Sequence, residues 1–264
     1  ISGTKTPEIK FSNVHLFSDD GLPILRGIDL TLVPGKIYGI CGASGAGKTS
    51  LISLLRLEHT PTAGKLLING DDISDLDPDD VRQRIGFLTQ HYTNLSSYTV
   101  REAITLGSQT RSPLSFEETC RIANIDFLGD HLEDSNCYLG LDFPNSMRFS
   151  GGQLQKIALA RTLSHNADII ILDEPTSALG TEDEEKIFPA LISWAQKSGK
   201  TLIIISHKFA NLSICQEIIY LKDGTILEQG SHGELLSKEG EYAKRYRLEA
   251  SQYSGSKSKA IQSN

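Results

Sequence analysis

The sequence has no long hydrophobic run, and its longest purely apolar segments have four residues, as in Ile169–Leu172. A helix that crosses a bilayer needs roughly 20 apolar residues, so we expect no membrane-spanning helix in these 264 residues. The composition, with 39% hydrophobic and 22% charged residues, is ordinary for a folded globular protein and excludes a disordered or collagen-like chain.

The chain also has no excess of basic residues. Its 33 acidic residues outnumber its 26 basic ones, which gives a net charge of -7. General nucleic-acid binders carry a basic footprint, so we expect no nucleic-acid partner, although a local phosphate site is compatible with this charge.

The cysteines show no C-x-x-C or metal-ligand spacing, which favours free thiols in the cytosol. They are Cys41, Cys120, Cys137 and Cys215.

Both ends of the chain are polar. Residues 1–8 begin with Ile1, show no signal peptide and are interpreted as the end of a linker, so we expect a piece of a longer protein. Residues 251–264 are rich in Ser and Lys and predict a flexible tail. The folded domain is therefore expected over residues 9–250.

Short apolar runs alternate with helical patterns along this domain. Several runs have apolar residues at consecutive positions, which is typical of strands buried on both faces of a sheet. These runs lie within residues 36–41, 168–172, 201–206 and 217–221. Helical patterns follow several of these runs, which indicates an α/β fold. Residues from about 91 to 165 contain no convincing strand and predict a mostly helical insert.

One glycine-rich segment fits G-x-x-x-x-G-K-[ST] at every fixed position. It follows an apolar strand and precedes a helix, the context that distinguishes a phosphate loop from a glycine turn with an incidental lysine. We expect Lys48 to reach the β- and γ-phosphates of a nucleotide and Thr49 to bind Mg²⁺. The predicted nucleotide-binding residues here are Gly42, Ala43, Ser44, Gly45, Ala46, Gly47, Lys48, Thr49 and Ser50.

A second buried strand ends in two carboxylates, Asp173 and Glu174. Ligands of open α/β sheets lie at the carboxyl ends of the strands, so Asp173 is suited to hold Mg²⁺. Glu174 can orient and deprotonate a water molecule for attack on the γ-phosphate. Seen alone, the pair could be solvated acids at a strand end, but the phosphate loop favours the functional interpretation.

The segment Phe149-Ser150-Gly151-Gly152-Gln153 opens a helical pattern and resembles the LSGGQ signature of ATP-binding cassette (ABC) ATPases. Its serine and glycines at a helix start form a further anion-binding end. Two more residues match the family by order and spacing: Gln90 resembles the glutamine of the Q-loop, and His207 resembles the switch histidine. Without this context, Gln90 would be a loop residue and His207 a structural one.

The resemblance covers about residues 9–248 and implies the ABC ATPase fold. That fold combines a P-loop NTPase core of mostly parallel strands with an antiparallel β subdomain and a helical subdomain at about 91–165. It also implies ATP and Mg²⁺ as cofactors, with Glu174, His207 and Gln90 in catalysis and Thr49, Gln90 and Asp173 at the metal. Ser150, Gly151, Gly152 and Gln153 would contact the ATP of a facing domain.

By the same resemblance, the chain would be the ATPase domain of an ABC exporter. Two such domains, identical or different, would close head-to-tail on two ATP molecules and drive a transmembrane domain outside this chain. The location would then be the cytoplasmic face of a membrane. The alternatives are an ABC-type ATPase of an importer or of a soluble non-transport system, and an inert ATP-binding scaffold. The scaffold is disfavoured because Glu174 and His207 are both present.

Three positions depart from the family pattern. Gly180 stands where an aspartate is usual, and residues 143–146 lack the Gly-Glu-x-Gly pattern of exporters. The aromatic residue that stacks on adenine is usually a tyrosine near the first strand. Here Phe17 is the candidate, or Ser18 if the loop aligns one residue later, and Phe17 could equally be a core residue.

Overall fold

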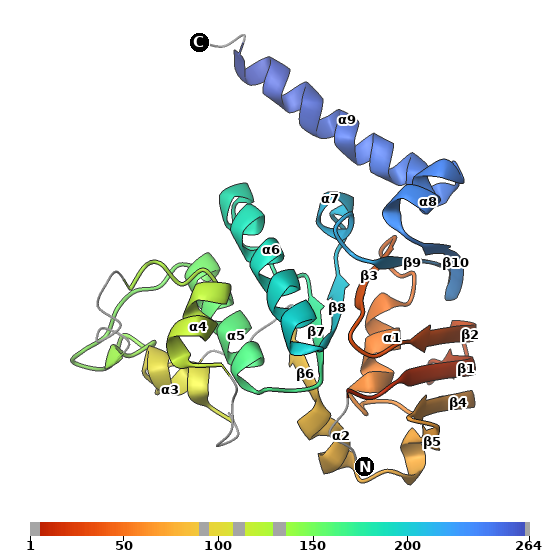
Figure 1. The fold of residues 1–264 in the computed structure, drawn as a ribbon, viewed down its shortest axis with the longest axis horizontal. Helices are drawn as coiled ribbons and strands as arrows, with labels where there is room; N and C mark the ends of the chain where they lie inside the picture. The colour runs from red at the N-terminus through yellow and green to blue at the C-terminus, as the bar shows by residue number, and fades with distance from the viewer. Residues whose placement is uncertain (1–5, 90–94, 108–113, 129–135, 262–264) are drawn as a thin grey trace. The chain divides into compact units, whose positions relative to one another are not determined.

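A computed structural model describes residues 6–89, 95–107, 114–128 and 136–261, with side chains described as far as Ser251 (Figure 1). The chain divides into two compact units. Unit 1 comprises Ile1–Glu8, Val33–Lys36 and Asp75–Ile203, and unit 2 comprises Ile9–Leu32, Ile37–Ser74 and Ile204–Asn264. The division falls inside strand β8 (Thr201–Ile205), so each unit contains part of this strand.

Unit 2 contains an antiparallel sheet with the strand order β2-β1-β4-β5. Along β1, buried side chains shift from odd positions (Ile9, Phe11) to even positions (Val14, Leu16), because a register shift lies between Phe11 and Val14. Such a bulge lets one strand keep its apolar side chains on the core face after the interruption. The bounds are β1 Ile9–Phe17, β2 Pro23–Leu32, β4 Ala63–Ile68 and β5 Asp71–Asp72.

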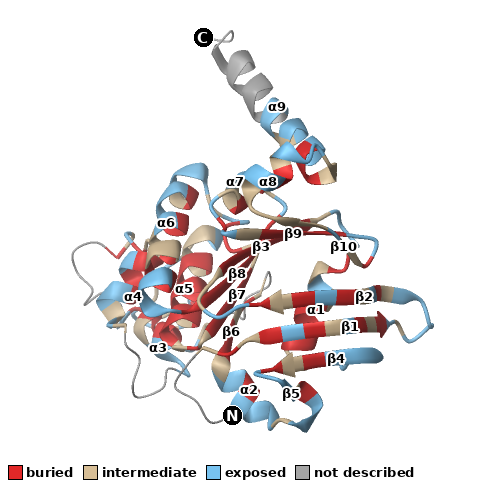
Figure 2. Cartoon of the chain, turned by 45° about the vertical axis from the view of Figure 1, so that its right-hand side comes forward, coloured by how far each residue is buried: buried red, intermediate tan, exposed pale blue. Residues whose placement is uncertain are grey.

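The second sheet of unit 2 has the order β10-β9-β3-β8, with β3 and β9 parallel. Five of the six residues of β3 and four of the six of β9 are buried, in line with their apolar sequence (Figure 2). Strands β9 and β10 form a hairpin whose turn, Asp223-Gly224, has positive φ at both residues. The bounds are β3 Ile37–Gly42, β9 Glu217–Lys222 and β10 Thr225–Gly230.

The helices of unit 2 pack on these strands and on one another. Helix α1 contacts β2 and β3, α7 contacts β3 and α9, and α8 contacts β10 and α9. Tyr242 at the start of α9 is fully buried, and its hydroxyl lies 2.8 Å from His232 Nδ1. The bounds are α1 Lys48–Leu55, α7 Phe209–Leu212, α8 His232–Ser237 and α9 Glu241–Ile261.

Unit 1 has the strand order β8-β7-β6, and β6 and β7 run parallel. Helix α5, with nine of its 14 residues buried, contacts α3, α4 and β6, while α6 contacts α4 (Figure 1). Helices α3, α4 and α5 each begin with a capping box, a serine or threonine followed three residues later by Glu or Gln. The bounds are β6 Ile85–Leu88, β7 Ile169–Asp173, α2 Pro78–Arg84, α3 Val100–Thr105, α4 Phe116–Ile122, α5 Gly151–Ser164 and α6 Thr181–Ser198.

The predicted α/β class is confirmed, with parallel and antiparallel sheets and interleaved helices. The described residues between 95 and 165 hold α3, α4, α5 and two isolated bridges but no strand, in line with the predicted helical insert. The domain boundaries stay predictions, and helix α9 extends through much of the segment interpreted as a flexible tail. All four cysteines are buried and none of them forms a disulfide. In the part of the chain described, no helix is long and apolar enough to cross a bilayer.

Candidate functional site

The glycine-rich loop of unit 2 has a backbone that requires glycine. Gly42 has φ 149°, and a Cβ there would lie against the carbonyl oxygen of Leu221. Gly47 has φ 102°, and a Cβ there would lie 2.8 Å from Leu25 Cδ2. These positions exclude side chains, so the loop can curl tightly between β3 and α1 and present its backbone outward. Ala43, Ser44 and Gly45 form its exposed rim.

Lys48 and the start of α1 give this loop its positive character. The Lys48 ammonium group donates to the carbonyl oxygens of Gly42 at 2.8 Å and of Ala43 at 2.9 Å, so it lies across the loop. Helix α1 begins at Gly47 without a side-chain cap and without an acidic residue in its first turn. No N-cap side chain therefore covers the first turn of α1, which suits the approach of a phosphate anion to its N–H groups. Thr49 is exposed in the same turn, and Ser50 follows it half-buried.

Phe17 and His207 also belong to unit 2. Phe17 ends β1 and is 41% exposed, so its ring is available for stacking rather than sealed in the core. Ser18 closes the following turn, because its hydroxyl accepts a hydrogen bond from Leu22 N at 3.1 Å. His207 is exposed and follows Ser206, whose backbone N–H donates to Ile40 O in the neighbouring strand β3. The roles of Phe17 and His207 stay predictions.

In unit 1, Asp173 ends β7 and Glu174 follows it, and both are half-buried. Glu174 has φ 51°, a left-handed conformation that costs a residue with a side chain roughly 1–3 kcal/mol. Its carbonyl oxygen accepts hydrogen bonds from Gln155 Nε2 at 3.0 Å and from Ser177 N at 3.2 Å. These bonds hold the unusual conformation at the point where the sequence predicts a general base.

The predicted signature residues form the first turn of α5. Ser150 is the N-cap: its hydroxyl accepts from Gln153 N at 3.2 Å, and Gln153 Oε1 accepts from Ser150 N at 2.8 Å. Ser150 and Gly151 are exposed, and a Cβ on Gly151 would meet nothing within 4 Å. Gly152, in contrast, lies close to the chain after β7, since its Cβ would approach Ala178 O at 3.0 Å. The turn therefore offers an open face to a ligand or to a second molecule.

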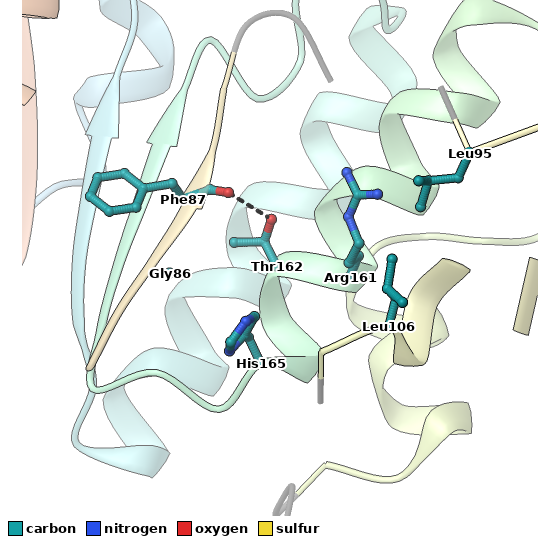
Figure 3. Close-up of a pocket in the computed structure, with 7 residues that line it drawn as sticks. All are labelled: Gly86, Phe87, Leu95, Leu106, Arg161, Thr162 and His165. Atoms are coloured by element: carbon teal, nitrogen blue, oxygen red, sulfur yellow. Dashed lines mark hydrogen bonds between the residues drawn. The ribbon is translucent and has the colours of Figure 1, made fainter. Parts of the chain in front are cut away.

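Gln90 lies outside the described residues, just beyond the end of β6. Beside β6 and α5 there is a hollow of about 310 Å³ that none of the predicted site residues lines. Figure 3 shows Thr162 of α5 donating to the carbonyl oxygen of Phe87, at 3.3 Å, in the wall of this hollow. The lining residues are Gly86, Phe87, Leu95, Leu106, Arg161, Thr162 and His165.

Sequence reasoning missed Gln155, which connects α5 to the chain that follows Glu174. This glutamine is only 2% exposed. Its position relative to the buried Leu159 and Thr162, four and seven residues later, places it on the inward face of α5. A polar residue on an apolar helix face needs internal partners, and that signal was present in the sequence.

The next residue, Lys156, connects α5 to helix α6 by an ion pair. Its ammonium group lies 2.7 Å from Asp183 and 3.3 Å from Asp126, and only 7% of its side chain is exposed. Burial acts to raise the pKa of Asp183, but hydrogen bonds from Lys156 and Asn124 outweigh it and lower this pKa. The second turn of α5 is thus connected to the first turn of α6 through the ion pair of Lys156 with Asp183.

Comparison with known proteins finds relatives that match most of the chain. The family model described as ABC transporter matches residues 25–177, more than half of the chain. The chain is 38% identical over 243 residues to an ATP-dependent lipid A-core flippase of Syntrophus aciditrophicus, covering 92% of this chain and 39% of that protein. It is 35% identical to ABC transporter B family member 3 of Dictyostelium discoideum over 90% of this chain and 16% of that protein.

A solved structure has the same fold. A bacterial Atm1-family ABC exporter, determined with ATP bound, is similar with a TM-score of 0.85 and 30% identity, covering 95% of this chain and 43% of that one. The chain therefore spans less than half of the length of each of these relatives.

Proposed function

The chain belongs to the ABC transporter family as an ATP-binding, ATP-hydrolysing domain, and we propose that it drives export through a transmembrane domain. The observation that carries the ATP-binding role is the loop of residues 42–49, with its glycine-only backbone and with Lys48 across two of its carbonyl oxygens. The export role rests on relatives that match almost the whole chain while the chain covers less than half of them. The working location would be the cytoplasmic face of a membrane.

The residue roles that we propose follow from chemistry. Lys48 and the N–H groups at the start of α1 bind the phosphates, and Phe17 stacks on the adenine. Thr49, Gln90 and Asp173 offer only oxygen ligands, which is the donor set that Mg²⁺ prefers. The Mg²⁺ ion would neutralise charge on the phosphates.

For the hydrolysis step, we propose that Glu174 orients the attacking water and accepts its proton, with His207 and Gln90 as further catalytic residues. The left-handed backbone of Glu174 supports this role, because strained residues that the surrounding structure holds in place cluster at active sites. The carboxylate follows the end of a buried strand, where its position is restricted by β7.

We further propose that the residues from Ser150 to Gln153 complete the ATP site of a second ABC ATPase domain, identical or different. The exposed faces of Ser150 and Gly151 support this, since an N-terminal helix turn that is open to solvent can accept the γ-phosphate held by another molecule. ATP would then join the two domains and hydrolysis would release them.

The experiment uses the Glu174→Gln variant, in which slow hydrolysis preserves ATP. Light scattering at tens of micromolar should show a dimer with Mg-ATP and a monomer with Mg-ADP. Adding Ser150→Arg should abolish the ATP-dependent dimer while ATP binding by the monomer persists. Ser115→Arg is the matched control, because Ser115 caps α4 with the same kind of capping box and is also exposed. A dimer that persists with Ser150→Arg, or that Ser115→Arg abolishes equally, would contradict the shared site.

A further inference from the structure

The buried amide of Gln155 binds three groups of the chain that follows β7. Its Nε2 donates to Glu174 O at 3.0 Å and to Ser177 Oγ at 3.2 Å, and its Oε1 accepts from Ala178 N at 2.9 Å. The two backbone partners determine which end of the amide is oxygen, because a carbonyl can only accept and an N–H can only donate. Gln155 therefore spans both ends of the turn formed by residues 174–178.

This turn starts at the proposed general base. Glu174 has φ 51°, and Gln155 bonds to the carbonyl oxygen of that same residue. The direction of the Glu174 side chain depends on its φ and ψ angles, so a bond that holds the carbonyl also holds the carboxylate. The backbone bond from Ser177 N to Glu174 O closes the turn but comes from within it, whereas Gln155 anchors it to a separate helix.

Close packing supports the rigidity of this anchor. The first turn of α5 approaches the same chain so closely that a Cβ on Gly152 would lie 3.0 Å from Ala178 O and 3.1 Å from Leu179 Cδ2. Farther along, Thr176 donates to Glu184 Oε1 at 2.6 Å, a buried bond that ties the turn to α6. The turn is thus held between α5 and α6, and Gln155 provides its contact with Glu174.

We propose that Gln155 is a positioning residue for ATP hydrolysis, which holds the Glu174 carboxylate in its catalytic direction by hydrogen bonding to the Glu174 backbone. The proposal rests on the proposed role of Glu174 as the base. Gln155 itself touches no reacting atom. Its removal should therefore affect the chemical step and leave ATP affinity nearly unchanged.

The main test is Gln155→Met in the 264-residue chain, since methionine has a similar length and flexibility but cannot form these hydrogen bonds. We expect kcat for ATP hydrolysis to fall by about 10- to 100-fold, with KM and the Kd for ATP within about threefold of the wild-type values. Thr162→Val is the matched control: Thr162 is a 6% exposed residue of the same helix that donates to Phe87 O and Ala158 O. It should keep the wild-type kcat.

A second variant covers the case in which Gln155→Met does not fold. Gln155→Glu keeps the acceptor for Ala178 N but, when ionised, has no donor for Glu174 O. It should also lower kcat with little change in ATP affinity. Unchanged kcat in a folded Gln155 variant, or an equal loss in Thr162→Val, would overturn the proposal.

A double variant distinguishes positioning from general loss of structure. If Gln155 acts through the Glu174 carboxylate, then adding Gln155→Met to Glu174→Gln should slow single-turnover hydrolysis by less than about threefold. Losses that multiply would overturn the proposal. If Glu174→Gln alone hydrolyses ATP at the wild-type rate, then the proposed base is wrong. If Glu174→Gln is slow and the Gln155 variants are not, then only the positioning role is wrong.

Discussion

Lys48 is the residue whose removal should most reduce ATP binding. Its ammonium group lies over the loop, 2.8 Å from Gly42 O and 2.9 Å from Ala43 O. In Lys48→Ala these two carbonyl oxygens lose a donor. Gly42 is half-buried and Ala43 is exposed, so water can replace the ammonium group and the loop should stay folded.

The size of the effect follows from the hydrogen bonds exchanged on binding. A hydrogen bond to a charged group contributes about 1.5–3 kcal/mol, and the ammonium group gives up neutral carbonyl partners when it binds charged phosphate oxygens. We expect a net loss of about 2–4 kcal/mol, which corresponds to about 30- to 700-fold in Kd.

The assay is titration calorimetry with Mg-ATP, and Lys65→Ala is the control. Lys65 lies on β4 of the same unit, its side chain is 68% exposed, and its nitrogen is 3.8 Å from Asp72. Its removal changes the net charge by the same amount but should leave Kd unchanged. A Kd for Lys48→Ala within threefold of wild type, with an unchanged unfolding temperature, would refute the reasoning. An equal loss in Lys65→Ala would show that net charge alone is responsible.

Two further predictions concern hydrolysis and association. Glu174→Gln should slow single-turnover hydrolysis by about 100-fold or more while the Kd for ATP stays within threefold, and a wild-type rate would place the base elsewhere. Gly180 caps α6 with φ -78°, and a Cβ there would meet nothing within 4 Å, so Gly180→Asp should fit without strain. In the Glu174→Gln background, light scattering should show an ATP-dependent dimer about fivefold tighter with Gly180→Asp, as one added hydrogen bond would give. Gly180→Ala is its control, and equal or weaker association of the Asp variant would contradict the prediction.

The sequence predicted best those parts of the fold that are determined by a short run of neighbouring residues. The strands β3, β7 and β8 have consecutive buried residues because both faces of their sheet are covered, and such runs are visible in the sequence. The phosphate loop was equally visible, because its backbone tolerates only glycine at Gly42 and Gly47 and the sequence must supply it.

Other elements depend on contacts that no local pattern shows. Strand β10 has no buried residue and forms because the turn at Asp223-Gly224 returns the chain along β9. Helices α3 and α8 have only six residues, too few for a clear apolar period, and their capping boxes at Thr99 and Ser231 define them instead. The partners of Gln155 are 19–23 residues away in the chain, so only the packed structure identifies them.

Helix α5 carries both the Ser150 turn proposed to contact a facing domain and Gln155, the residue proposed to position Glu174. Its N-terminal turn, capped by Ser150, would bind the ATP of the facing domain. Gln155, five residues later, is bonded to Glu174 O and would position Glu174 for the ATP of its own domain. A helix moves as a unit over such a short distance, because its backbone hydrogen bonds connect successive turns. Any displacement of the first turn on binding ATP would therefore reach Glu174 through the Gln155 amide. Gln155 variants should accordingly weaken the dependence of hydrolysis on dimer formation as well as its rate.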